Sequence, residues 1–134
     1  MYWNGNGPMA GMHFAFPDVC LVPGPFGPIP MPFPNIVQTP MAMPNQQKVM
    51  LMGMPSHNLM TKTALSQGDE AGTMGGVVSH TGMGPACGAM GSSNVILCGA
   101  PVAKFGMPTK QNGTVPNAVG MTIAPSQTKV MSMR

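Results

Sequence analysis

The sequence is short of charge, of aromatic residues and of long apolar runs. Charged residues make up 7% and aromatic residues 5% of the 134 positions, whereas about 25% of an ordinary soluble domain is charged. The six basic residues are scattered, with no basic stripe and no interleaved aromatics, which argues against a nucleic-acid partner. No apolar run approaches the ~18–20 residues that span a bilayer. The N-terminus also lacks the basic region and apolar core of a signal peptide, so we expect synthesis in a reducing cytoplasm.

Catalytic and disulfide patterns are missing as well. The three cysteines are an odd number with no C-x-x-C spacing, and they do not suggest a disulfide framework. The sequence has no Gly-X-Ser-X-Gly motif, P-loop, or Cys–His pairing with a third orienting group. Asp69 and Glu70 are adjacent and point different ways on an extended chain, which makes a poor general acid–base pair. Asp18 follows a proline and is typical of a turn. We predict a protein that is not an enzyme.

Glycine and proline are abundant instead. The 18 glycines and 16 prolines form about a quarter of the chain, a level at which disorder has to be considered. The apolar fraction of 43% and the net charge of +3 are not those of a disordered chain. No helical apolar period runs for ten residues without a glycine or proline. We predict one all-β, loop-rich domain over residues 1–134, with residues 1–11 a loosely ordered N-terminal extension.

Nine prolines lie between residues 17 and 44. Proline fixes φ, cannot donate to a ladder, and pushes the preceding residue to an extended conformation. We predict an extended, polyproline-like segment laid over a surface. The alternative is a flexible linker, but linkers rarely carry apolar anchors such as Ile29, Met31 and Phe33.

One segment of the chain occurs nearly three times. Residues 93–101 are echoed by residues 47–55, and residues 128–133 give a third, shortened copy. Each copy is a short apolar run after a polar residue, and two copies stop at a Gly-X-Pro sequence, which is typical of a strand bounded by a turn. A unit used three times in a small chain predicts internal pseudo-three-fold character.

Methionine is unusually frequent, with 17 residues. Thioether sulfurs select Cu(I), so the Met-X-Met pairs allow a copper site. The alternative is that two-residue spacing places these flexible side chains on one face of a strand, where they pack against a neighbour or partner. We favour packing, because most of these pairs fall in the repeated segments. The pairs are Met41/Met43, Met50/Met52/Met54 and Met131/Met133.

A zinc site is a second metal candidate. Three histidines and one thiolate can close a tetrahedral structural site, and a metal would suit a small, loop-rich domain that needs a staple. None of the spacings is local, so unrelated surface or core residues are the alternative. The candidate residues are His13, His57 and His80 with Cys20, Cys87 and Cys98.

The repeated segment and its flanks resemble a known family. Residues 91–104 are similar to the PAAR repeat, with residues 101–104, Pro-Val-Ala-Lys, standing where that family has Pro-Ala-Ala-Arg. Three further blocks resemble the PAAR-like branch found in bacterial type VI secretion clusters, and together they cover nearly the whole chain from about residue 12. These blocks are residues 16–20 running into residues 28–35, then residues 68–72, then residues 124–130.

The resemblance implies a small conical β-structure that caps a homotrimeric VgrG-type spike, one copy per trimer. Its broad base would sit on the spike, and its tip would sharpen the spike for membrane puncture. Members of the PAAR type hold a zinc ion near the tip with three histidines and a cysteine. The matching set here is His13, His57 and His80 with Cys20, or with Cys98 as the alternative cysteine.

A single chain on a three-fold spike must present roughly the same surface three times, and the echoed strands can do that. We expect one structural zinc, separately recruited effectors or adaptors, and no fused C-terminal toxin. The protein would assemble in the bacterial cytoplasm and be secreted into the target cell, with transient contact to its membrane. The alternative is a periplasmic copper- or zinc-binding protein. The expected spike contacts are Val49, Met50, Leu51, Met52, Val95, Ile96, Leu97, Val130, Met131 and Met133.

Overall fold

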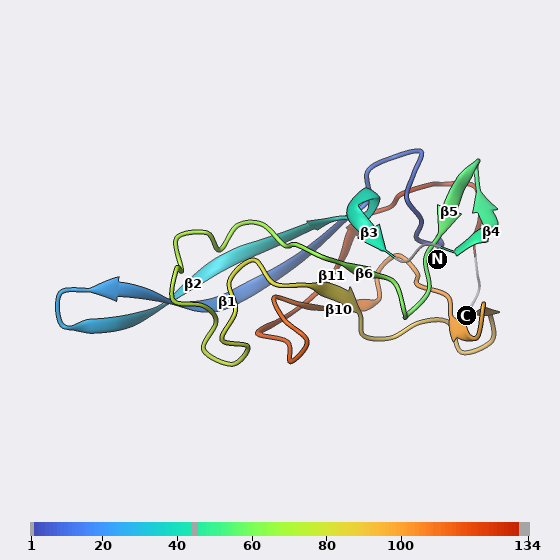
Figure 1. Cartoon of the computed structure of the whole chain (residues 1–134). Coiled ribbons are helices and arrows are strands. Elements are labelled where there is room, and N and C mark those ends of the chain that lie inside the picture. The colour runs from blue at the N-terminus through green and yellow to red at the C-terminus, as the bar shows by residue number, and fades with distance from the viewer. Residues whose placement is uncertain (1, 44–45, 132–134) are drawn as a thin grey trace.

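The computed structural model describes residues 2–43 and 46–131, and it confirms an all-β chain (Figure 1). Eleven strands and one short 3-10 helix are present in this part of the sequence. Among the described residues, no helix has the length and apolar character needed to span a bilayer. The elements are β1 (Met12–Gly24), β2 (Gly27–Gln38), η1 (Thr39–Met41), β3 (Ala42–Met43), β4 (Gln46–Leu51), β5 (Met54–Ser56), β6 (Lys62–Thr63), β7 (Ala86–Gly88), β8 (Ile96–Leu97), β9 (Ala100–Pro101), β10 (Pro108–Gln111) and β11 (Ala118–Ala124).

Seven strands form one antiparallel sheet in the order β2-β1-β11-β10-β7-β6-β3. The two longest strands, β1 and β2, pair as a hairpin that projects as a narrow finger from one end of the molecule (Figure 1). Two small hairpins, β4–β5 and β8–β9, lie at the opposite end with both chain ends (Figure 1). We call these the finger and the broad end.

The proline-rich segment is extended, as predicted, but it is a paired strand and not a polyproline segment lying over a surface. β2 is an edge strand of the sheet, with β1 as its partner. Its prolines, Pro28, Pro30, Pro32 and Pro34, fall at every second position. Successive N–H groups of a strand point to opposite sides, so proline is tolerated at an edge where its missing N–H faces outward. The intervening residues Ile29, Met31 and Phe33 are then free to bond to β1.

The two full copies of the repeated segment fold as hairpins with the same register. Residues 52–53 and residues 98–99 occupy the two turn positions, with φ of 51° and 82° in the first copy and 51° and 86° in the second. Positive φ at both positions is the mark of a type I′ turn, whose second position favours glycine. The prolines of the Gly-X-Pro sequences lie in the returning strands. The matched pairs are Leu51 with Met54, Met50 with Pro55, Leu97 with Ala100, and Ile96 with Pro101.

The third unit is assembled from both ends of the chain. Met131 pairs with Tyr2 in the way that Met50 pairs with Pro55, and the Trp3 N–H donates to the Val130 carbonyl at 3.1 Å. Residues 2–6 therefore act as the returning strand of the shortened copy. The predicted loose N-terminal extension is instead paired here over residues 2–6.

Three backbone hydrogen bonds tie the units into a closed ring. The Asn4 N–H donates to the Ala103 carbonyl at 2.9 Å, Ala103 donates to His57 at 3.2 Å, and His57 donates to Asn4 at 3.0 Å. Each of these residues lies two positions beyond the equivalent paired residue of its own unit. A second set of backbone bonds repeats the same three-way pattern, with donors two positions after the ring residues and acceptors two positions before them. It joins Asn6 to Pro55, Leu59 to Pro101 and Phe105 to Tyr2. We call the Asn4–His57–Ala103 set the axial ring, and it gives the fold its pseudo-three-fold axis.

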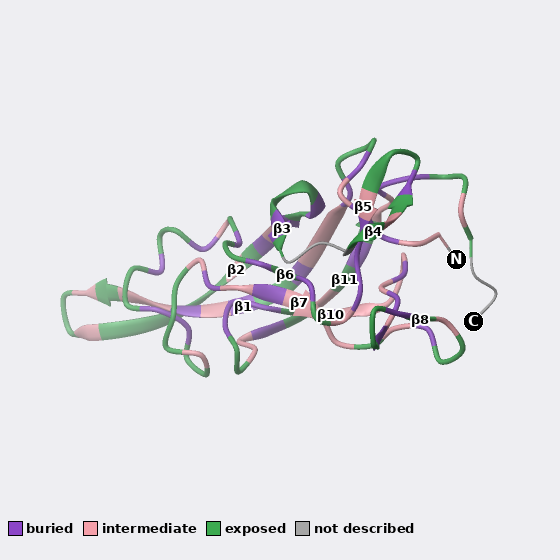
Figure 2. Ribbon diagram, turned by 45° about the vertical axis from the view of Figure 1, so that its right-hand side comes forward, coloured by how far each residue is buried: buried purple, intermediate pink, exposed green. Residues whose placement is uncertain are grey.

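The interior is small and polar. The buried apolar side chains of the described residues are alanines, valines, leucines and one cysteine, and buried polar side chains outnumber them. Most methionines and isoleucines are exposed. Figure 2 shows exposed segments in the outer loops and in the small hairpins of the broad end. Hydrogen bonds between the buried polar side chains and the backbone are therefore a large part of what holds the interior together.

We predict that removal of residues 1–6 opens the third unit. The truncated chain loses five backbone hydrogen bonds of residues 2–6, four to the other two units and one to Val130 within the third unit, each with a net value of about 1 kcal/mol. The expected loss of roughly 5 kcal/mol is comparable to the whole stability of a marginal domain, and thermal unfolding would measure it. A peptide of residues 1–10 added in trans should restore the transition, and a scrambled peptide should not. An unchanged midpoint in the truncated chain would contradict the closed ring.

Candidate functional site

The broad end carries one exposed apolar residue at the same position of each unit. Met50 and Ile96 each stand two positions before the first turn residue of their hairpins, and Met131 is paired with Tyr2 in the equivalent way. The three side chains are 54%, 67% and 57% exposed. An isolated exposed apolar residue is ordinary, but a set repeated around an axis indicates a surface that a partner covers. We call these three residues the apolar triad.

The other predicted spike contacts differ in how far they are buried. Leu51 and Leu97, which follow the triad residues Met50 and Ile96 in the sequence, are buried in the fold. Met52 is exposed in the first turn. The valines that precede the triad in each copy, Val49, Val95 and Val130, are half-buried. Met133 lies outside the described residues.

A small cavity lies behind the axial ring. All three ring residues, Asn4, His57 and Ala103, line this cavity of about 30 Å³, together with His13 and Cys87. The Asn4 Oδ1 atom is buried and has no hydrogen-bond partner among the described residues. The cavity is therefore polar and lies against the pseudo-three-fold axis.

The two histidines of the cavity are neutral. Burial lowers the pKa of His13 and of His57 to about 4, and for His57 the neighbouring His13 lowers it further. Each ring is oriented by one bond: His57 Nε2 donates to Asn6 Oδ1 at 2.7 Å, and His13 Nδ1 lies 2.9 Å from Thr122 Oγ1. The two uncharged rings therefore line the cavity as polar side chains, each held by one hydrogen bond.

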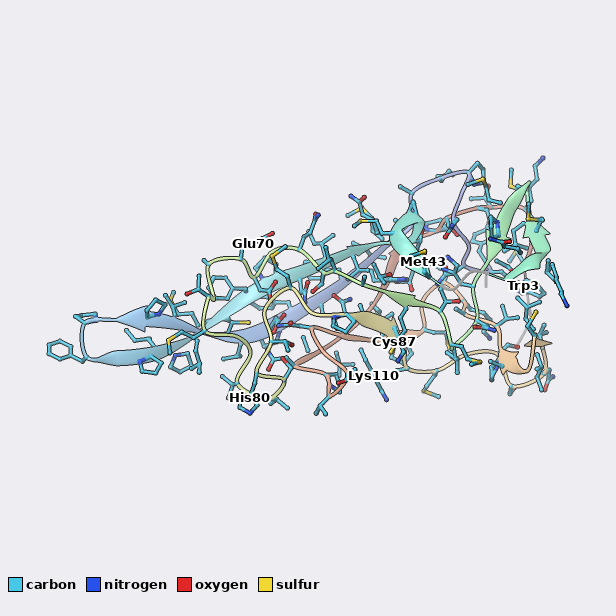
Figure 3. All side chains as sticks on the ribbon, viewed as in Figure 1. Trp3, Met43, Glu70, His80, Cys87 and Lys110 are labelled. Carbon is cyan, nitrogen blue, oxygen red and sulfur yellow. The ribbon has the colours of Figure 1, made fainter. Side chains whose placement is uncertain are left out.

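The predicted histidine–cysteine zinc set is not brought together. His13 and His57 meet at the cavity, but His80 is exposed in an outer loop away from Cys87 and Trp3 (Figure 3). Cys20 belongs to a different cluster, and Cys98 is exposed at the β8–β9 turn. Within the described ranges, no three of these residues place their ligand atoms within 4.8 Å of one another.

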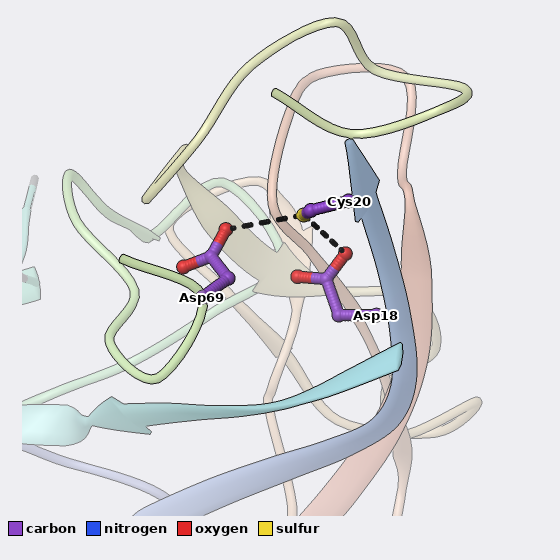
Figure 4. A group of neighbouring side chains, drawn as sticks. All are labelled: Asp18, Cys20 and Asp69. Atoms are coloured by element: carbon purple, nitrogen blue, oxygen red, sulfur yellow. Dashed lines mark hydrogen bonds between the residues drawn. The ribbon is translucent and has the colours of Figure 1, made fainter. Parts of the chain in front are cut away.

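A different group of ligands is assembled at the root of the finger. The ligand atoms of Asp18, Cys20 and Asp69 all lie within 4.8 Å of one another, and all three side chains are buried (Figure 4). Cys20 Sγ is 3.6 Å from Asp18 Oδ1 and 3.7 Å from Asp69 Oδ2. Burial, followed by the two neighbouring carboxylates, raises the pKa of the Cys20 thiol to about 12. This group could hold a metal ion.

Amide side chains surround the two carboxylates. Asn35 Nδ2 donates to Asp18 Oδ2 at 2.8 Å, and Asn112 Nδ2 donates to Asp18 Oδ1 at 3.2 Å and to Asp69 Oδ2 at 2.9 Å. Asn117 Nδ2 also donates to Asp18 Oδ1. The cluster thus joins strand β1 to two loops that are distant in sequence.

Sequence reasoning placed Asp18 in a turn and set Asp69 aside as half of a poor acid–base pair. The structure brings the two together because loop residues 72–77 run along β1. The Leu21 N–H donates to the Gly75 carbonyl, and the Val77 N–H donates to the Val19 carbonyl. Gly72 is required at the closest approach, since a Cβ there would lie 2.3 Å from Cys20 Cβ. The usable signal was that both acids lie inside blocks that resemble the family, residues 16–20 and 68–72.

Comparison with protein families found one match that covers most of the chain. The family model described as the toxin PAAR-like domain matches residues 11–119. The match includes the finger, the cluster at its root and both full hairpins of the broad end. Searches among curated proteins and among solved structures found no match.

We predict that stability falls with acidity through the cavity histidines. Their folded pKa of about 4 lies below the ordinary value of 6.5, so the unfolded chain binds protons first as the pH drops. The free energy of unfolding should be fully supported above about pH 6.5 and decline toward pH 4, by up to about 1.4 kcal/mol per pH unit for each histidine. Denaturant titrations across this range measure the slope.

His57→Gln should reduce this slope, because glutamine stays uncharged at every pH. His80→Asn is the matched control at an exposed histidine and should leave the slope unchanged. Equal slopes in the His57 variant and the wild type would show that the cavity histidines do not carry the effect.

Proposed function

Since the chain belongs to the toxin PAAR-like domain family, we propose that it is the tip of a type VI secretion spike, seated by its broad end on a trimeric VgrG-type protein. Family membership fits a spike-tip or toxin-related role, and PAAR-like domains associate with VgrG spikes. The seating, one copy per trimer, and the puncture of a target membrane are the parts that we add.

The apolar triad is the observation that carries the proposal. A lone chain on a three-fold partner meets three identical surfaces, so its own contacts have to repeat around one axis. Met50, Ile96 and Met131 repeat in this way. They occupy equivalent positions of the three units, although they are far apart in the sequence and are not all the same residue type. Two of the three are methionines, whose unbranched, flexible side chains can adapt to a pocket shape that the stiffer isoleucine also fills.

The composition supports burial of this end. With 7% charged residues, the chain has few of the groups that keep a free surface soluble and monomeric. Main-chain edges of the small hairpins can extend a β-structure of the spike, while the triad supplies apolar contact. The combination of strand addition and apolar anchors favours a stable, assembled state over a transient encounter.

The finger points away from this seat and suits the leading end. Its turn carries Phe26, which is fully exposed, and Ile29 and Met31 on β2 are about half exposed. Residues 19–33 contain no charged side chain, so little desolvation opposes brief contact with lipid. We propose cytoplasmic assembly followed by ejection into the target cell, with effectors or adaptors recruited separately.

A catalytic role is not part of the proposal. PAAR-like domains are spike-associated or toxin-associated structural modules and are not typically enzymes. The alternative role, a methionine-rich copper- or zinc-binding protein, is compatible with the Asp18–Cys20–Asp69 group, but that group does not favour it.

Substitution of the triad tests the seat. Met50→Asp, Ile96→Asp and Met131→Asp each place a charge at an equivalent contact, so each should weaken binding to the cognate spike trimer by at least about tenfold, and by similar amounts. Light scattering after gel filtration would give the mass of the complex, and surface-immobilised spike would give the affinity.

Val119→Asp is the matched control, because Val119 is 63% exposed on β11 and lies outside the triad. It should bind like the wild type. Wild-type affinity in the three triad variants, or a complex with three tip chains per trimer, would overturn the proposed seat.

The finger can be tested separately from the seat. Phe26→Ser should leave the thermal midpoint and the affinity for the spike unchanged, because Phe26 has no cover in the fold. It should reduce type VI-dependent killing of a competitor strain, which is the measured outcome. Met43→Ser, at a 69% exposed position on β3 outside the finger, is the control, and equal killing by both variants would remove the finger from the delivery step.

A further inference from the structure

The cluster at the root of the finger buries two carboxyl groups and a thiol without a basic side chain beside them in the described part of the chain. Asp18, Cys20 and Asp69 are 0%, 0% and 1% exposed, and within the described ranges neither carboxylate has an ion pair. Two buried oxygens there, Asp69 Oδ1 and Asn35 Oδ1, have no hydrogen-bond partner. Buried carboxylates are normally paired with a cation or coordinate a metal, because desolvation of an uncompensated charge is costly. The spike seat does not use this cluster.

The spacing of the cluster is that of a coordination shell. Zinc bonds of about 2.0–2.3 Å in a tetrahedron place the ligand atoms roughly 3.3–3.7 Å apart. Cys20 Sγ lies 3.6 Å and 3.7 Å from the two nearest carboxylate oxygens. The amide group of Asn112 covers the same three atoms, at 3.6 Å from Cys20, 3.2 Å from Asp18 and 2.9 Å from Asp69. Three possible ligands and one amide donor, from three parts of the chain, therefore lie within contact of one another.

We propose that this cluster is a zinc site, with Cys20, Asp18 and Asp69 as protein ligands and the Asn112 amide as the neighbouring fourth group. Calcium and magnesium take oxygen ligands, whereas a thiolate with carboxylates suits zinc. On binding, the Cys20 S–H loses its proton to solvent and a Zn–S bond forms. The Asn112 Oδ1 atom accepts from the Gly84 N–H, so the Asn112 Nδ2 group would keep donating to the two ligand carboxylates beside the ion.

The site would fix the finger to the body of the molecule. Asp18 and Cys20 stand on β1 just beyond its bulge, where the finger leaves the sheet, while Asp69 and Asn112 come from two loops. A bound ion would add a cross-link that a narrow structure with few buried apolar groups otherwise lacks.

Cobalt(II) is the probe for the thiolate ligand. Purified full-length protein, freed of metal and titrated with Co²⁺, should develop the near-ultraviolet charge-transfer band of a cobalt–thiolate bond, and Zn²⁺ should bleach it. Cys20→Ser should abolish the band. Cys87→Ser and Cys98→Ser are matched controls that should keep it. No band in the wild type, or a band that survives Cys20→Ser and is lost in Cys87→Ser, would overturn the site.

Two further variants keep the test independent of folding in Cys20→Ser. Asp69→Asn preserves shape and should lower zinc affinity at least about tenfold. Asn112→Asp adds a third carboxylate, so it should unfold more easily in chelator and regain stability with Zn²⁺. The thermal midpoint of the wild type should also rise with Zn²⁺. If zinc and chelator leave the midpoints of the wild type and Asn112→Asp unchanged, the cluster is a hydrogen-bonded amide–carboxylate lock and the zinc site is refuted.

Discussion

The fold depends on the axial ring, in which Asn4, Ala103 and His57 each donate a backbone hydrogen bond to the next. Because each bond joins a different pair of units, none of the three units is complete without the others. The consequence is a threefold arrangement made by one chain, with its last unit closed by residues from both ends. The ring residues line the polar cavity, and the units that they join carry the exposed triad, so the candidate seat and the interior chemistry follow from the same constraint.

The echoed segments predicted the pseudo-three-fold character because hairpin register is encoded locally. The Met-Gly and Cys-Gly dipeptides form the type I′ turns, and the leucine before each turn is buried. The third unit was harder to foresee, since nothing in residues 2–6 resembles residues 55–59 apart from their capacity to pair through the backbone. Strand addition of this kind leaves little trace in side-chain pattern.

The metal candidates show the same division between local and long-range information. His13 and His57 meet because the axial ring carries one of them to the sheet that holds the other, while His80 stays in a loop. The acidic cluster arises from a loop that lies along β1, which no spacing in the sequence reveals. Asp69 was discounted for its neighbour Glu70, yet its partners are 51 and 49 residues away in sequence, at Asp18 and Cys20. A cluster of this kind depends on how the loops lie against the sheet, which residue spacing in the sequence does not reveal.

The prolines of β2 have a consequence beyond their place in the sheet. Along the outer edge of the finger, residues 28–34 offer carbonyl groups but no N–H groups, so a second chain finds no complementary ladder to extend. Apolar side chains line this part of the molecule, and without the prolines it would be an open template for cross-β stacking. The prolines therefore protect the finger from edge-to-edge pairing with a second copy of the chain. Strand edges that can pair with a partner are then left at the broad end, where the spike would bind.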